Sequence, residues 1–327
     1  MPVEPIPTIW VLTDGKAGDE IQCLGVAERL GITPEIRHIA PGRPWSWLMP
    51  RGPIDPREAP HRPQSPIRPP FSDIVIASGR RAAAYLRAVK KASNGRTFTV
   101  FLKDPRIGTG AADLIWVSEH DRLRGPNVLV TVTSPHRLSP GQLAQARQSP
   151  PPAIAALPRP RAAVMVGGDS RHHTFRPDDI ARFANLLDML AGSGVALMGS
   201  RSRRTPPALD KAIAEVFARH GGWWWDGTDA NPYVPLLANA DTVVVTADST
   251  NIVGEAAATG APLLVFEPHG GHGKIARFLE ALKRQGVVHH FEGRLDGTRY
   301  DPLDSTGVIA EAVRQGWLRH RAELGLA

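Results

Sequence analysis

One segment, residues 242–268, constrains the fold of this chain more than any other. It reads TVVVTADSTNIVGEAAATGAPLLVFEP. A short apolar run rich in valine leads into a polar turn, a short helical pattern that stops at Gly260, and a second apolar run. Two fully apolar runs joined through one helix are typical of neighbouring strands in a parallel sheet that is buried on both faces. The segment therefore predicts a βαβ unit.

Apolar runs alternate with helical patterns along most of the chain. Strands are expected at residues 9–12, 73–77, 97–102, 113–117, 128–132, 162–166 and 195–198. Helices are expected over residues 19–30, 177–190 and 274–285. This order is typical of α/β proteins with doubly wound parallel sheets.

A proline-rich segment, residues 145–161, divides the pattern and is predicted to be a stiff linker. We expect one Rossmann-like domain over residues 1–150, a second over residues 161–304, and a last helix within residues 305–327 that packs back on the first domain. Two doubly wound domains of similar size predict a cleft between them, with ligands at the carboxyl ends of the strands.

Residues 41–70 interrupt this plan. They are rich in proline and arginine and include Trp45, Trp47, Leu48 and Met49. One interpretation is an irregular surface insertion. The other is an element that contacts lipid or protein, because aromatic side chains beside cations suit a membrane interface.

Composition narrows the class of protein. No apolar run reaches the roughly 18–20 residues that cross a bilayer, and the first residues lack the pattern of a signal peptide. Cys23 is the only cysteine, which excludes an intrachain disulfide and argues against a cysteine-based zinc site. We expect a cytoplasmic protein, peripheral on the inner membrane if residues 41–70 bind lipid.

The chain is basic, with 39 Lys and Arg against 32 Asp and Glu. The excess reflects either genomic base composition or attraction to an anionic lipid or nucleotide. No sequence signature of a nucleic-acid-binding module is found, so no nucleic-acid partner is expected.

The polar turn after residues 242–246 is the first candidate site. The first N–H groups of a helix have no partner inside it, and the helix dipole favours an anion there. Ser249, Thr250 and Asn251 are small enough to let a phosphate approach these donors. Glu255 follows about one turn later, where a carboxylate would accept hydrogen bonds from sugar hydroxyls. Asp248 would repel a diphosphate and is expected to cap the helix or fix the turn.

Three other turns follow predicted strands in the second half. Gly167, Gly168 and Ser170 form a turn whose backbone a phosphate or sugar can approach closely. Arg201 could clamp a diphosphate bidentately, with two of its guanidinium nitrogens. Lys274 falls in the first turn of a helix, where a cation is repelled by the helix dipole unless an anion such as phosphate lies nearby. The alternative at each place is an ordinary solvated turn.

The loop DGKAGD, residues 14–19, joins the first strand to the first helix. It matches neither the P-loop nor the dinucleotide fingerprint. One interpretation is a tight turn with Asp19 as the helix cap. In the other, Lys16 and the turn amides contact a ligand, and Asp14 or Asp19 is the catalytic base on an acceptor hydroxyl. No serine-hydrolase elbow or HExxH motif is present, and no metal site is predicted.

Several segments carry a resemblance to a known family. WVLTDGKAGDEIQCLGVAERLG, FLKDPRIG, EHDRLRGPNVLVTVTSPHRL, VGGDSRHHTF, GSRSRRTP and ADSTNIVGEAAATGAPLLVFEP together resemble the bacterial branch of the elongated-mitochondria fission protein family. In plants, the named role of that family is to recruit a dynamin-related protein to mitochondria. A bacterium has no mitochondrion, so this role is not carried over.

The layout also resembles GT-B glycosyltransferases, such as lipid-A-disaccharide synthase and the peptidoglycan N-acetylglucosaminyltransferase. That likeness implies that residues 249–251 bind the diphosphate, that Glu255 binds the ribose, and that the turn of Gly167, Gly168 and Ser170 opens the nucleotide-sugar domain. It also implies that residues 14–19 lie on the acceptor side.

These observations predict an α/β protein with two Rossmann-like domains that face a cleft, and a metal-independent GT-B-like glycosyltransferase. Its donor would be a nucleotide diphosphate sugar, with no further cofactor, and its acceptor a cell-envelope component. An anionic membrane surface or a lipid-linked acceptor is the other expected partner. A non-catalytic membrane-associated adaptor and a sugar-nucleotide epimerase are the alternative hypotheses.

Overall fold

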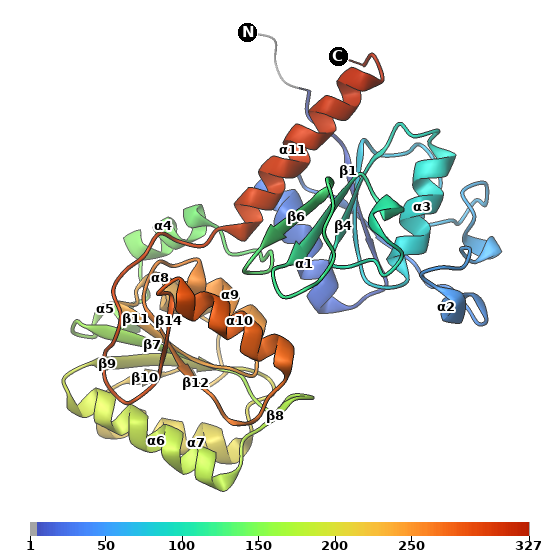
Figure 1. Ribbon diagram of the computed structural model, residues 1–327. Helices are drawn as coiled ribbons and strands as arrows, with labels where there is room; N and C mark the ends of the chain where they lie inside the picture. Colours follow the sequence, from blue (N-terminus) through green and yellow to red (C-terminus); the bar gives the residue numbers. More distant parts are fainter. Residues whose placement is uncertain (1–4, 327) are drawn as a thin grey trace. The chain divides into compact units, whose positions relative to one another are not determined.

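The computed structural model describes residues 5–326, which form two compact units. The first unit contains the residues up to Arg137 together with those from Asp304 onward, and the second is Leu138–Leu303. Each unit is built on one six-stranded parallel sheet (Figure 1). The predicted α/β class, with two doubly wound parallel sheets, is confirmed.

The sheet of the first unit has the strand order β2-β1-β3-β4-β5-β6. Its strands are β1 (Ile9–Thr13), β2 (Glu35–His38), β3 (Ile74–Ser78), β4 (Phe98–Leu102), β5 (Leu114–Ser118) and β6 (Val128–Thr131). Its helices are α1 (Ala17–Arg29), α2 (Trp45–Leu48), α3 (Ala82–Ala92), α11 (Ser305–Glu323) and the 3-10 turns η1 (Pro56–Glu58) and η2 (Thr109–Ala111). The chain leaves β1 first to one side and then to the other, so the switch point lies between β1 and β3.

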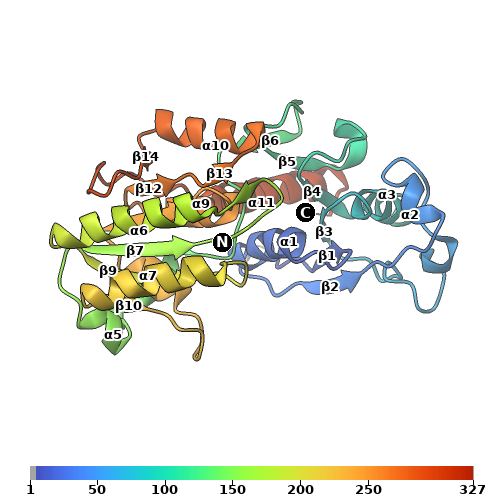
Figure 2. The same ribbon diagram turned by 90° about the horizontal axis from the view of Figure 1, so that it is seen from below.

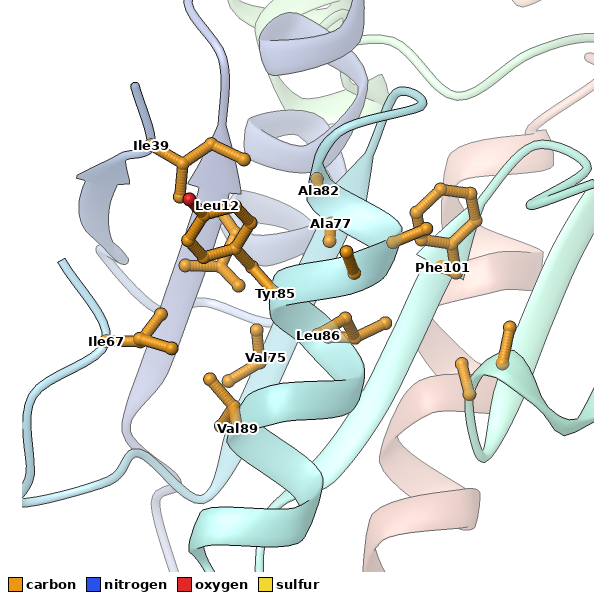
Figure 3. Close-up of a cluster of buried hydrophobic side chains, with 14 of the residues drawn as sticks. Leu12, Ile39, Ile67, Val75, Ala77, Ala82, Tyr85, Leu86, Val89 and Phe101 are labelled. Atoms are coloured by element: carbon orange, nitrogen blue, oxygen red, sulfur yellow. The ribbon is translucent and has the colours of Figure 1, made fainter. Parts of the chain in front are cut away.

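Helices cover both faces of this sheet because its strands are apolar on both faces. Helix α3 packs Tyr85, Leu86 and Val89 onto Leu12 and Val75 of the strands (Figure 3). Helices α1 and α11 cover the opposite face with apolar side chains at helical spacing, among them Val26, Val313 and Trp317. The C-terminal helix α11 therefore belongs to the core of the first unit.

The sheet of the second unit has the order β10-β9-β7-β11-β12-β14, the arrangement of dinucleotide-binding folds. Its strands are β7 (Arg161–Val166), β9 (Ala196–Arg201), β10 (Trp223–Trp224), β11 (Thr242–Thr246), β12 (Leu263–Phe266) and β14 (Val288–His290). A separate antiparallel pair joins β8 (His173–Thr174) to β13 (His269–Gly270). The switch point of this sheet lies between β7 and β11.

Helices again lie on both faces of the second sheet. They are α4 (Pro140–Gln148), α5 (Pro152–Ala155), α6 (Pro177–Gly192), α7 (Pro207–Arg219), α8 (Tyr233–Ala238), α9 (Thr250–Ala257) and α10 (Gly273–Arg284). Helices α6 and α7 bury Phe183, Leu187, Ile213 and Phe217 against one face. Figure 2 views the second unit from the side that these two helices cover, and α9 and α10 lie on the other side (Figure 1).

The border between the units differs from the predicted one. The first unit ends at Arg137 rather than at residue 150, because α4 packs against α8 of the second unit. Arg147 donates to the Ala238 carbonyl at 3.0 Å, and the Asn239 amide donates to the Ala146 carbonyl at 3.2 Å. The predicted linker, residues 145–161, thus contains the end of α4 and the short helix α5.

No helix within residues 5–326 has the length and apolar character needed to cross a bilayer.

Candidate functional site

The second unit gathers several predicted residues at the carboxyl edge of its sheet, between β7 and β11. The Thr246 hydroxyl accepts the Gly167 N–H at 2.8 Å and donates to the Asp248 carboxylate at 2.6 Å. The Gly168 N–H donates to the second Asp248 oxygen at 3.0 Å. These bonds join the turn after β7 to the turn after β11 at the switch point of the sheet, where ligands bind in folds of this order.

Arg204 completes this connection. Its guanidinium donates to Asp248 at 2.9 Å and to the Asp169 carbonyl at 2.9 Å. The Asp248 side chain is fully buried, whereas the Arg204 side chain is 44% exposed. Asp248 therefore fixes the turn, which is one of the two roles predicted for it. Its negative charge is balanced by Arg204, and the exposed part of the Arg204 guanidinium stays accessible to a ligand. Arg204 was not among the predicted residues.

Helix α9 begins at this turn. The Ser249 hydroxyl accepts the Ile252 N–H at 3.4 Å and caps the helix. Among the residues that the structure describes, the N–H groups of Thr250 and Asn251 have no hydrogen-bond partner. Two donors at the positive end of a helix are thus available to an anion beside the Arg204–Asp248 pair.

The two glycines after β7 are required by packing within the protein. A Cβ on Gly167 would lie 2.2 Å from the Asp248 carboxylate, and a Cβ on Gly168 would lie 2.0 Å from the Arg204 carbonyl oxygen. Their small size lets the turns at residues 167–169, 202–205 and 248–251 approach one another.

Replacement of Gly168 by alanine should therefore destabilise the second unit. The nearest atom is backbone, so the turn at residues 202–205 must shift, and overpacking of this kind costs about 1–3 kcal/mol. Denaturant unfolding measures the change. Gly192→Ala is the matched control, since a Cβ there meets no atom within 4 Å. Equal stability of both variants would contradict the close approach at Gly168.

Glu255 lies one turn into α9, as predicted, and it has a partner. Its carboxylate accepts a hydrogen bond from the Tyr233 hydroxyl. Burial raises the pKa of Glu255, and burial together with the nearby Glu255 raises the pKa of Tyr233 well above its usual value. A ribose hydroxyl at Glu255 would share this carboxylate with Tyr233.

The other predicted residues of the second unit have contacts of their own. The Ser170 hydroxyl accepts the N–H groups of His172 and His173 at 3.3 and 3.1 Å. Arg201 donates to Asp210 at 2.9 Å and to the Asp226 carbonyl at 2.9 Å. Lys274 is exposed in the first turn of α10. The cation at the switch point is thus Arg204, three residues after the predicted Arg201.

The first unit has a comparable cluster at the carboxyl edge of β1, β3 and β4. Asp14 follows β1 and lies 3.4 Å from the Lys16 ammonium and 3.7 Å from the Arg81 guanidinium. Asp19 pairs with Lys103, and the Ser78 hydroxyl lies 3.4 Å from the Asp19 carboxylate.

Asp19 does not cap the first helix. Helix α1 starts at Ala17, with Lys16 at the N-cap position, so Asp19 falls inside the first turn and turns its carboxylate to Lys103.

Two features of this cluster are unusual for a structural site. The Asp14 side chain is 1% exposed, and neither of its oxygens accepts a hydrogen bond within the described residues. Buried polar atoms are nearly always hydrogen-bonded. Lys103 has a φ of 92°, which a residue with a side chain rarely adopts. Unpaired buried groups and backbone strain concentrate at functional sites.

Lys103, Arg81 and Ser78 were missed by the sequence analysis. A signal was present, because each follows a predicted strand directly or within four residues, and the carboxyl ends of parallel strands meet at one edge.

No group of three or more His, Cys, Asp and Glu side chains in the described part of the chain is arranged to hold a metal ion.

Fold and sites define a two-unit, Rossmann-like α/β protein with polar turns at both switch points. The family model described as "Mitochondrial fission ELM1" matches residues 17–317, so the chain belongs to this family, and the predicted resemblance is confirmed.

Two relatives support the family. The "Mitochondrial fission protein ELM1" of Arabidopsis thaliana is 28% identical over 277 residues, which cover 75% of this chain and 65% of the relative. An uncharacterized protein of Rickettsia prowazekii (strain Madrid E) is 32% identical over 161 residues, 46% of this chain and 45% of the relative. The chain therefore spans less than two thirds of the length of either relative.

Solved structures are similar to this chain at low identity. The UDP-N-acetylglucosamine 2-epimerase from Rickettsia bellii has a TM-score of 0.47 and 13% identity, with 97% of each chain covered. MurG from Acinetobacter baumannii has a TM-score of 0.49 and 12% identity, with 97% of this chain and 95% of that chain covered. These likenesses are too distant to bear on activity.

Proposed function

We propose that this chain is a glycosyltransferase that takes its sugar from a nucleoside diphosphate and holds the diphosphate at the switch point of the second unit. The observation that carries the proposal is the pair of N–H groups of Thr250 and Asn251, which have no partner among residues 5–326 and open α9 beside the Arg204–Asp248 pair.

The charges at this turn suit a diphosphate. Asp248 is already neutralised by Arg204 and accepts two further hydrogen bonds, from Gly168 and Thr246, so its repulsion of an anion is small. The helix N–H groups and the exposed part of the guanidinium are the donors that would stabilise the departing nucleoside diphosphate. In this scheme the donor needs no further cofactor.

Transfer also requires a base for the acceptor hydroxyl, and the first unit contains a candidate. The Asp14 carboxylate is buried and accepts no hydrogen bond within the described residues, and the Lys16 ammonium and the Arg81 guanidinium lie 3.4 and 3.7 Å from it. An acceptor hydroxyl would supply the missing hydrogen bond and give up its proton there. Asp19, engaged by Lys103, suits a positioning role better. A cell-envelope component stays the proposed class of acceptor.

The first test is a thermal-shift measurement with UDP, GDP, ADP and CDP at millimolar concentration. At least one should raise Tm by several degrees, because a ligand at about a hundred times its Kd adds about 2.7 kcal/mol to the free energy of unfolding. Absence of a shift with all four would refute the transferase and favour the non-catalytic adaptor.

A proline at position 250 removes one proposed donor without breaking the helix. Thr250 is the first residue of α9, where proline is accepted, and Ser249 has the extended conformation that a residue before proline adopts. Thr250→Pro should weaken binding of the nucleoside diphosphate about tenfold or more, the value of a hydrogen bond to a charged group. Thr250→Ala keeps the N–H and serves as control in calorimetry. Equal affinity of the two variants would show that this N–H does not bind the ligand.

A sugar-nucleotide epimerase would use the same donor turn. The test is incubation of the donor without any acceptor, with the product detected by chromatography. If the donor is isomerised under these conditions, the protein is an epimerase and not a transferase.

A further inference from the structure

We propose that the proline-rich insertion, residues 41–70 of the first unit, docks the protein on an anionic lipid surface through a tip formed by Trp47 and Leu48. This inference rests on the insertion alone and holds whether or not the chain transfers sugar.

The tip exposes apolar side chains from an otherwise anchored turn. Trp47 is 65% exposed and Leu48 is 52% exposed, whereas Ser46 and Met49 on either side of them are buried. All four belong to α2 or to its end, so one turn of helix directs two side chains inward and two outward. Figure 1 shows α2 at the rim of the first unit, beyond α3.

The body of the first unit holds this turn in place. Arg80 donates to the carbonyl oxygens of Ser46 and Met49, at 2.9 and 2.5 Å, and Arg87 donates to that of Pro50 at 2.8 Å. Ile67, from the far end of the insertion, is fully buried in the hydrophobic cluster beside α3 (Figure 3). The exposed pair is thus presented by a fixed backbone, with little conformational entropy to lose on binding.

Charge selects the partner. The insertion carries five exposed arginines, namely Arg43, Arg51, Arg57, Arg62 and Arg68. Its two acidic residues are occupied, since Asp55 is buried against Arg57 and Glu58 accepts a hydrogen bond from Tyr85. The pairing of Arg57 with Asp55 leaves Arg43, Arg51, Arg62 and Arg68 to face an anionic surface.

Two arginines flank the tip directly. The Arg43 guanidinium lies 5.3 Å from the centre of the Trp47 ring. Arg51 is part of the tight turn in which the Gly52 N–H donates to the Leu48 carbonyl at 2.8 Å. An amphipathic aromatic ring beside exposed cations matches the headgroup region of an anionic bilayer, where the ring meets the acyl boundary and each guanidinium meets a lipid phosphate.

The test is co-sedimentation of the full chain with phosphatidylcholine vesicles that contain or lack phosphatidylglycerol. Binding should require phosphatidylglycerol and should weaken as salt is added. The double variant Trp47→Ala, Leu48→Ala should bind about tenfold more weakly, because two interfacial apolar side chains are lost. Val308→Ala, at an exposed apolar position of α11, should bind as the wild type does.

The charge is tested separately. Arg43→Gln should weaken binding about fivefold, the effect of one arginine near an anionic surface, whereas Arg319→Gln, at an exposed position of α11, should not.

The depth to which the tip enters the bilayer is measured by the quenching of tryptophan fluorescence by brominated lipid. The chain has eight tryptophans, and we expect the quenching to disappear in Trp47→Phe, which assigns it to the tip. Failure of the wild type to bind anionic vesicles, or wild-type binding by the double variant, overturns the proposal. Thr250→Pro should bind vesicles as the wild type does. The lipid proposal and the proposed nucleotide site can therefore be refuted independently of each other.

Discussion

Asp14→Asn is expected to abolish most sugar transfer while leaving the protein folded. If Asp14 takes the proton of the acceptor hydroxyl, the amide cannot replace it, and loss of a general base lowers turnover by about 10²–10⁴-fold. The free energy of unfolding should fall by no more than about 1 kcal/mol, and it could rise. Within the described residues no hydrogen bond to Asp14 is lost, and its ion pairs are with Lys16, which is largely exposed, and Arg81, which is partly exposed, so they contribute little.

Donor consumption with an acceptor present measures the effect, and chemical denaturation measures the stability. Glu20→Gln, in the first turn of the α1 helix that follows this loop, is the control and should retain activity. If Asp14→Asn were as active as the wild type, the base would have to be another group. If the variant unfolded instead, Asp14 would be a structural residue.

Arg204→Met should weaken both the fold of the second unit and its affinity for a nucleoside diphosphate. The variant leaves the buried carboxylate of Asp248 without its cation, which costs about 3 kcal/mol or more for a fully buried pair. We expect about 2 kcal/mol here because Arg204 is partly exposed. Affinity should fall by about 10–100-fold if the guanidinium also binds the diphosphate.

A double variant separates the two effects. Arg204→Met with Asp248→Asn removes the unpaired charge, so stability should return while binding stays weak. Arg203→Met, at the exposed neighbouring position, is the control for a loss of charge alone. Wild-type affinity in Arg204→Met would exclude the guanidinium from the ligand site.

Most strands of the two parallel sheets could be predicted, because strands that are buried on both faces appear in the sequence as continuous apolar runs. Strand β11, which reads TVVVT and is buried throughout, is the clearest case. The edge strand β2 was missed, since its sequence EIRH is largely exposed and shows no apolar run. Strand β14 is likewise an edge strand and is only three residues long.

The candidate sites could be predicted as turns but not as contacts. The rule that strand ends converge identified residues 14–19, 167–170 and 248–251 correctly as neighbours of the switch points. The choice between Arg201 and Arg204 depends on a turn in which Ser202 and Thr205 bond to each other and to Gly167, and nothing in the local sequence specifies that geometry. The pairing of Glu255 with Tyr233 joins α9 to α8, a tertiary contact that no local pattern encodes.

The central claim is that the N–H groups opening α9 bind a diphosphate. It is tested most directly by a crystal structure soaked with the nucleoside diphosphate that gives the largest thermal shift. The account predicts phosphate oxygens within hydrogen-bond distance of the Thr250 and Asn251 nitrogens, with the Arg204 guanidinium beside them. A nucleotide bound elsewhere in the second unit, with these two nitrogens facing only water, would contradict it.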